Sequence, residues 1–252
     1  MKKNGFTLVE LLIAMFVGLI IMAAVYGVMT MAQRTSAGTE RKVLTQQDTR
    51  SVLDFMASEI RMASFNPSMM GTTWTNATTT ANVAACANVN GLIGGAPALT
   101  TANRGILFAN ANNLFIAMDL GPLGPPIVYG MIGDAQNELI FYRHNNANGS
   151  ITRSVSCGNN EVILGGGASG TTVYNNTIGR DLFEYFDRDG LQLTGAGATK
   201  VLSDAQIQAI RRIRINIAAE TENIDPNSKQ RKRMIYSTDI LVRNHAVFLP
   251  SI

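Results

Sequence analysis

The sequence has few of the residues that bind metals or carry out catalysis. Its 252 residues include only two histidines and two cysteines, and neither His144 nor His245 is close to a cysteine. The chain also has no Gly-x-Ser-x-Gly motif, no paired histidine ligands and no carboxylate dyad on a recognisable element. Because metal sites and hydrolytic active sites need such clusters, we expect no metal, no cofactor and no enzymatic activity.

Charged residues are scarce as well, at 15 % of the chain, and Glu10 is the only one in the apolar run Phe6–Ala32. As a helix this run would be about 40 Å long, which is enough to cross a hydrocarbon core of about 30 Å. Lys2 and Lys3 precede it, so the N-terminus is expected in the cytoplasm and the rest of the chain across the membrane. A cleaved secretory signal would have a shorter apolar region followed by a small-residue cleavage site.

The position of Glu10 indicates that its carboxylate finds a cation within the membrane. An acid at bilayer depth costs roughly 2.5–3.5 kcal/mol on insertion scales. Cutting the chain between Gly5 and Phe6 would free an α-amine about 6 Å along the helix axis from Glu10. Pairing the two charges removes much of the burial penalty, and a pair between two helices would also set their stagger. The alternatives are a plain membrane anchor that tolerates one acid, or an acid that pairs with its own N-terminus.

The segment Lys2–Ile13 (KKNGFTLVELLI) resembles the class III signal of type IV pilins and type II secretion pseudopilins. This resemblance implies that a prepilin peptidase cuts after Gly5 and that the new first residue, Phe6, is N-methylated. It also implies that Glu10 neutralises the N-terminal amine of an adjacent subunit during filament assembly. The implied partners are the peptidase, other pilins or pseudopilins, an inner-membrane assembly platform and membrane lipid. No nucleic-acid partner is expected.

Four regions follow from this pattern: a cleaved leader 1–5, a membrane and assembly helix 6–33, an amphipathic extension 34–65 and an exported β-rich domain 66–252. The extension carries an apolar stripe at helical spacing, and Asn66-Pro67 ends it. We therefore expect an α+β, pilin-like fold in which one helix, about 7–65, packs its second half on an antiparallel sheet. The stripe is Leu53, Met56, Ile60 and Ala63. The expected strands are 105–109, 113–118, 138–143, 151–156, 181–187, 191–193, 213–217 and 234–243, and Ser203 is expected to cap a short helix 204–210.

Cys86 and Cys157 both lie on the exported side, where oxidising conditions favour a disulfide. The alternative is two unpaired buried thiols. Bulk charge does not indicate nucleic-acid or membrane-surface binding, because removing Lys2 and Lys3 would leave 19 basic against 18 acidic residues.

Scattered blocks in the rest of the chain resemble the group formed by minor pilin W and pseudopilin J. The resemblance implies a low-abundance subunit that primes assembly at or near the tip of a pilus. The membrane segment lacks the helix-kinking proline common in major pilins and has Gly27 in that region, which also favours a minor subunit. Two alternatives remain: a J-like pseudopilin of type II secretion, and an adhesin or binding module displayed at a tip. The blocks are 47–55, 59–63, 183–190, 210–215 and 237–244.

Several local motifs have a functional and a plain interpretation, and the plain one is favoured for each. Asp187 and Asp189 begin like a calcium loop but lack its later ligands, so a turn is expected. The basic segment 229–233 suits a solvated loop better than a phosphate site. The glycine-rich segment 165–170 lacks a phosphate-loop Lys-Ser/Thr, so it indicates a linker. Trp74 and Tyr129 are expected to pack rather than to bind a ligand.

Overall fold

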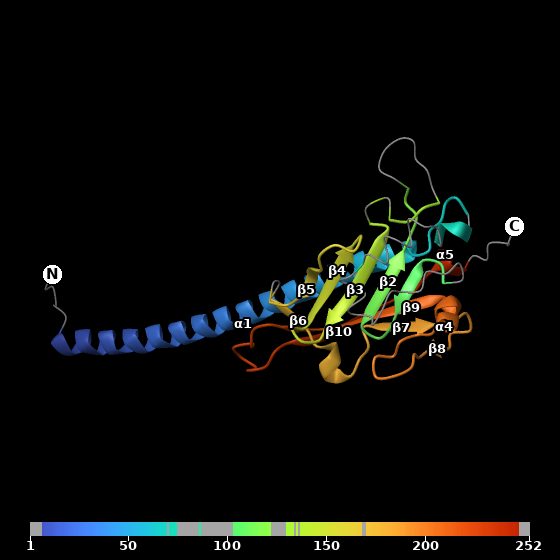
Figure 1. The fold of residues 1–252 in the computed structure, drawn as a ribbon. Helices are drawn as coiled ribbons and strands as arrows, with labels where there is room; N and C mark the ends of the chain where they lie inside the picture. Colours follow the sequence, from blue (N-terminus) through green and yellow to red (C-terminus); the bar gives the residue numbers. More distant parts are fainter. Residues whose placement is uncertain are drawn as a thin grey trace.

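Figure 1 shows the computed structural model, which describes residues 7–69, 71–74, 86, 103–121, 130–133, 135, 137–167 and 170–246. A long N-terminal helix projects from a β-rich body, as the α+β pilin-like prediction requires. The helices are α1 (Leu8–Met62), α4 (Asp204–Ala209) and α5 (Arg243–Ala246), with 3-10 turns η1 (Gly71–Trp74) and η2 (Asn175–Ile178). The strands are β1 (Ile106–Ala109), β2 (Asn113–Ala117), β3 (Leu139–Asn145), β4 (Ser150–Val155), β5 (Glu161–Gly165), β6 (Thr171–Val173), β7 (Phe183–Phe186), β8 (Gln192–Leu193), β9 (Arg212–Thr221) and β10 (Arg233–Leu241).

Helix α1 is continuous over 55 residues, about 80 Å at 1.5 Å per residue. Its buried residues all lie in the second half, and the predicted stripe is among the most buried parts of the chain. The helix ends at Met62, three residues earlier than expected. Ser64 adopts a left-handed backbone conformation with φ of 65°, which stops the helix before Asn66-Pro67.

The strands form two antiparallel five-stranded sheets. The first sheet is a simple meander in the order β1-β2-β3-β4-β5. The second has the order β10-β9-β7-β8, and β6 also pairs with β9. The second half of α1 packs against β9, β10 and β5, so one main core lies between the helix and both sheets.

A second apolar cluster covers the opposite face of the first sheet. It includes Trp74, Cys86, Phe115, Ile132 and Phe141, and the rings of Phe115 and Phe141 meet edge to face at 5.8 Å. Strands β1 to β3 are therefore buried on both faces, which explains why their sequences are nearly continuously apolar rather than alternating.

Most predicted elements are present, with small shifts at their ends. Ser203 caps α4 with a capping box, as expected. The turn predicted over 144–150 is shorter, because His144, Asn145 and Ser150 belong to β3 and β4. The linker predicted over 165–170 is wrong in part: Gly165 ends β5, a turn follows, and β6 begins at Thr171, while residues 168 and 169 lie outside the described residues. Strands β5 and β6 were not predicted.

Candidate functional site

The first half of α1 is an apolar surface that the rest of the described chain leaves uncovered. Its large apolar side chains between Leu8 and Met31 are 48–81 % exposed. The most apolar 18-residue window has a mean hydropathy of 2.7, and none of it is buried. An exposed apolar rod of this length needs lipid or other apolar helices around it. Length and composition thus qualify this half of α1 to cross a membrane.

Glu10 lies at the start of this surface and takes part in the helix cap. Its carboxylate Oε2 accepts hydrogen bonds from the backbone nitrogen of Thr7 at 2.9 Å and from the Thr7 hydroxyl at 3.0 Å. The Glu10 nitrogen in turn donates to Thr7 Oγ1 at 3.3 Å, which completes a capping box. Before cleavage the Glu10 carboxylate therefore has a hydrogen-bond partner in its own chain. This arrangement resembles the alternative in which Glu10 pairs with its own N-terminus.

The predicted cleavage and methylation site, Gly5 and Phe6, lies outside the described residues. Phe6 is bonded directly to Thr7, so an amine freed at Phe6 would lie one residue from the group that Glu10 binds in the uncut chain. An ammonium is a stronger partner for a carboxylate than a neutral N–H. The cap thus holds Glu10 where cleavage would create a positive charge, and the pairing between subunits stays a prediction.

A largely buried ion pair joins the second half of α1 to the first sheet. Arg153 of β4 binds Glu59 of α1 through two hydrogen bonds, Nη2 to Oε1 at 2.5 Å and Nε to Oε2 at 2.9 Å. The two side chains are 12 % and 16 % exposed. The hydroxyl of Tyr142, the cross-strand neighbour of Arg153, also donates to Glu59, and the guanidinium lies over the ring of Phe55. Burial, and then the Glu59 charge, raise the pKa of the Tyr142 hydroxyl.

Cys86 and Cys157 form the predicted disulfide across 71 positions of sequence. Cys86 is fully buried in the cluster that also holds Trp74, and Cys157 follows the end of β4. The bond therefore ties Cys86, in the cluster on the outer face of the first sheet, to the residues that follow β4. Trp74 packs in this cluster, as predicted, while Tyr129 lies outside the described residues.

Both histidines are buried parts of the fold. The hydroxyl of Ser64 lies 2.9 Å from His245 Nδ1 and accepts the Gly105 N–H at 3.1 Å, and His245 Nε2 lies 2.9 Å from the carbonyl of Ile207. These bonds join the end of α1 to β1, α4 and α5. Burial lowers the pKa of His245 to about 4, helped by the nearby Arg104 and Arg211. Burial likewise lowers the pKa of His144 to about 4.

These two histidines predict that mild acid destabilises the domain. Their folded pKa values lie below the ordinary value of 6.5, so the unfolded chain binds protons first and stability falls as pH drops from 6.5 towards 4. Each histidine should cost about 2 kcal/mol of unfolding free energy between about pH 7 and about pH 5. Urea unfolding of the detergent-solubilised chain at both pH values measures this loss. In the variant His144→Phe/His245→Gln most of the difference should disappear, and an unchanged pH dependence would contradict it.

Two buried carboxylates organise the connection from β2 to β3, and sequence reasoning missed both. Glu138 accepts the backbone N–H groups of Leu120, Gly121, Gly133 and Ala135 at 2.6–3.2 Å. Asp119 accepts those of Gly121 and Gly130, the latter at 2.6 Å. Acids flanking two apolar strands are a weak signal in sequence, because most such acids are solvated. Here the two carboxylates take the place of water as hydrogen-bond acceptors for backbone N–H groups that lie below the surface.

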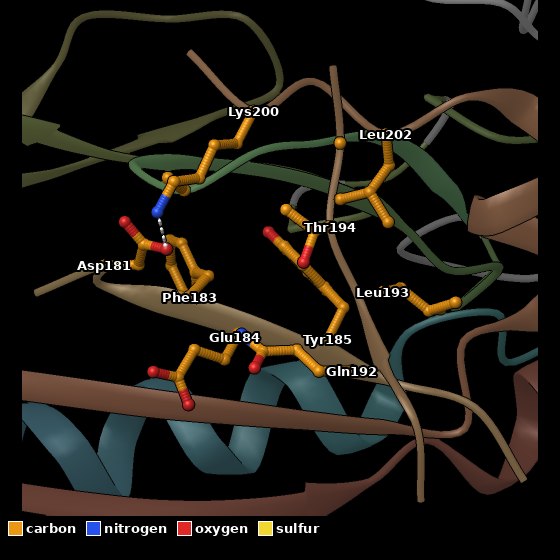
Figure 2. Close-up of a pocket in the computed structure, with 11 residues that line it drawn as sticks. Asp181, Phe183, Glu184, Tyr185, Gln192, Leu193, Thr194, Lys200 and Leu202 are labelled. Atoms are coloured by element: carbon orange, nitrogen blue, oxygen red, sulfur yellow. Dashed lines mark hydrogen bonds and ion pairs between the residues drawn. The ribbon is translucent and has the colours of Figure 1, made fainter. Parts of the chain in front are cut away.

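The loop at Asp187 is a turn, as predicted. The Asp187 carboxylate accepts the backbone N–H groups of Asp189 at 2.9 Å and Leu191 at 2.8 Å, which closes the turn before β8. Within the described residues no group of three or more His, Cys, Asp or Glu side chains is arranged to hold a metal ion. Figure 2 shows a pocket beside this hairpin in which the Lys200 ammonium reaches Asp181 at 2.5 Å. Its volume of about 10 Å³ suits one water molecule, so it is no ligand site.

Comparison with known proteins gives a match at the N-terminal end of the chain. Residues 1–26 match the family model of the prokaryotic N-terminal methylation motif. This range contains Gly5, Phe6 and Glu10, and it supports a class III signal on a type IV pilin- or pseudopilin-type protein. No curated protein and no solved structure matches the chain significantly. The match covers 26 of 252 residues and bears on the signal alone.

Proposed function

We propose that the protein is a minor type IV pilin that is inserted as a prepilin, cut after Gly5 and incorporated at or near the tip of a pilus to prime assembly. The observation that carries the proposal is the uncovered apolar half of α1 with Glu10 at its start, within the methylation motif. In this proposal the N-terminus lies in the cytoplasm and the β-rich body in the periplasm, until the subunit leaves the inner membrane for the filament. Prepilin peptidase, an assembly platform and other pilins are its partners.

Two alternatives share parts of this proposal. A J-like pseudopilin of type II secretion would use the same helix and acid, and a knockout distinguishes them by loss of surface pili or of secreted enzymes. A tip-displayed adhesin would use the segment 71–102 for binding. Trp74 and Cys86 of that segment are buried against the first sheet, so deleting the segment would also expose core residues. Substitution of its polar residues is the cleaner test of adhesion.

Mass spectrometry of the mature N-terminus tests the proposal most directly. Protein purified from native membranes should begin at Phe6 and carry one methyl group on its α-amine. A control with Gly5→Leu should stay uncut, because a branched side chain at the cut site blocks the peptidase that the motif implies. A native chain that still begins with Met1 would overturn the proposal, because no new amine would then exist for Glu10.

Paired substitutions at the helix cap separate the charge of Glu10 from its capping role. Glu10→Gln keeps a side chain that can complete a capping box but removes the charge. Thr7→Ala keeps the charge and removes the hydroxyl of the cap, a change worth about 1 kcal/mol of helix stability. We expect Glu10→Gln to be inserted and cut but to co-purify at least tenfold less with partner subunits, while Thr7→Ala behaves nearly like the wild type. The reverse order would assign Glu10 to the cap alone.

A further inference from the structure

The loop between β9 and β10 is seated on α1 where the helix leaves the membrane segment. The amide of Asn227 donates to the hydroxyl of Thr35 at 2.9 Å. Gly38, which is buried, leaves room for Asp225, whose Oδ2 would lie only 2.9 Å from a Cβ at that position. In Figure 1 this loop projects along α1 towards the N-terminus. Its height relative to the membrane helix is thus fixed by contacts with that helix.

The loop places its basic residues around an open pocket. Four of the five residues 229–233 are basic, and Lys229, Arg231 and Arg233 line a pocket of about 420 Å³ with Ile224. Glu220 pairs with Arg231 and Arg233 at once, both at 2.9 Å, so one acid stands against two guanidinium groups. Lys229 makes no ion pair within 4.0 Å in the part of the chain that the structure describes. Lys232 pairs with Asp225 at 3.3 Å, and residues 220–233 together carry four cations against three acids. Among the described residues that line the pocket itself, however, there are three cations and no acid.

The position of the loop corresponds to the depth of lipid headgroups. Thr35 lies four residues beyond Met31, about 6 Å along the helix axis. If the hydrocarbon core ends at Met31, the apolar run from Phe6 to Met31, about 39 Å long, spans a core of about 30 Å when the helix is tilted, and Glu10 stays within it. The headgroup layer adds roughly 5–8 Å on each side, so the contact at Thr35 falls within it. Ile224, 56 % exposed, lies beside the cations as an apolar contact for the interface.

We propose that the β9–β10 loop binds the phosphate groups of anionic phospholipids on the far face of the membrane before the subunit enters a filament. Lys229, Arg231 and Arg233 supply the cations, and Ile224 contacts the interface. The ligand chemistry is a phosphate monoanion at a basic pocket, and the bilayer is its source. Such binding would hold the β-rich body upright over the membrane. This inference rests on the proposed membrane insertion of α1.

Hydrogen–deuterium exchange of the full-length chain in lipid nanodiscs tests the inference. We expect the peptide covering 222–233 to exchange about fivefold more slowly in phosphatidylglycerol discs than in phosphatidylcholine discs, the effect of roughly one phosphate contact. In Lys229→Gln/Arg231→Gln this difference should vanish. The matched control Arg180→Gln/Arg188→Gln removes two exposed cations elsewhere and should keep it. Inorganic phosphate added to phosphatidylcholine discs should give no protection.

The outcomes separate this inference from the proposed function. Slow exchange of residues 8–31 in both kinds of disc shows that α1 is inserted. Inserted α1 with no lipid-dependent protection of the loop overturns the inference and leaves the pilin proposal standing. Equal protection by inorganic phosphate would show an anion site that does not need the bilayer, and would also overturn it. Rapid exchange of residues 8–31 would overturn both.

Discussion

Replacing Arg153 by alanine is expected to lower the unfolding free energy of the domain by about 3 kcal/mol, the lower end of the range for a buried pair, because both side chains keep some exposure. The change would leave the Glu59 carboxylate at the junction of α1 with the first sheet without its guanidinium partner. A buried acid that loses its cation keeps the cost of desolvation without the compensating attraction. For a domain of this size, we expect the melting temperature to fall by about 10 °C. Circular dichroism and urea unfolding of the detergent-solubilised chain measure both quantities.

Two controls show whether the stranded charge causes the loss. Arg188→Ala removes an 82 % exposed arginine and should change stability by at most about 0.5 kcal/mol. The triple variant Glu59→Met/Tyr142→Phe/Arg153→Met removes the whole polar cluster and should recover most of the stability, because no charge is then left buried. If Arg153→Ala and Arg188→Ala lose the same stability, the prediction that the Glu59–Arg153 pair holds α1 on the first sheet is contradicted.

Removing the disulfide with Cys86→Ser/Cys157→Ser should cost about 4 kcal/mol of unfolding free energy in the chain-entropy estimate for 71 positions. Trp74 is the only tryptophan of the chain and lies in the same apolar cluster as Cys86. Its fluorescence therefore reports on whether this cluster, here called the cover, stays packed on the first sheet. We expect the emission to shift to the red at a lower urea concentration than the loss of circular dichroism in the double variant. In the oxidised wild type the two transitions should coincide.

Reducing agent provides the matched control for this prediction. Wild-type protein treated with reductant should follow the double variant, and the double variant itself should not respond to reductant. A double variant with wild-type stability would contradict the estimate. Coincident fluorescence and circular dichroism transitions in the double variant would instead show that the cover and the sheet unfold together without the bond.

The parts of the fold set by local sequence were predicted, whereas the parts set by distant contacts were not. The apolar stripe of α1, the strand of alternating isoleucines and the cap at Ser203 each depend on neighbours in the sequence. Strand β6 has only three residues, and its strand conformation depends on its pairing with the far end of β9. That end of β9 contains Ala218, Ala219 and Glu220, which have weak strand propensity. Partners on both sides of β9 extend that strand beyond the predicted range 213–217.

The candidate site divides in the same way. Glu10 was identified from sequence, because a lone acid in an apolar run needs an explanation whatever the fold. Its hydrogen bonds with Thr7 required the structure, since a capping box looks like any Thr-x-x-Glu in a longer apolar context. Glu59 lies within the apolar pattern of α1, which was a usable signal, but its partners Tyr142 and Arg153 are more than 80 positions away. Such pairs can be identified only when the position of the sheet relative to α1 is known.

The seat of the β9–β10 loop at Thr35 and the Glu59–Arg153 pair attach α1 to the β-rich body at two heights, about 36 Å apart along the helix. Contacts at two heights prevent α1 from rotating about its own axis, so the direction of every side chain in its first half is fixed relative to the sheets. One inserted residue between these contacts would rotate the two halves against each other by about 100°. A neighbouring subunit that pairs with Glu10 would therefore have one fixed orientation relative to the β-rich body.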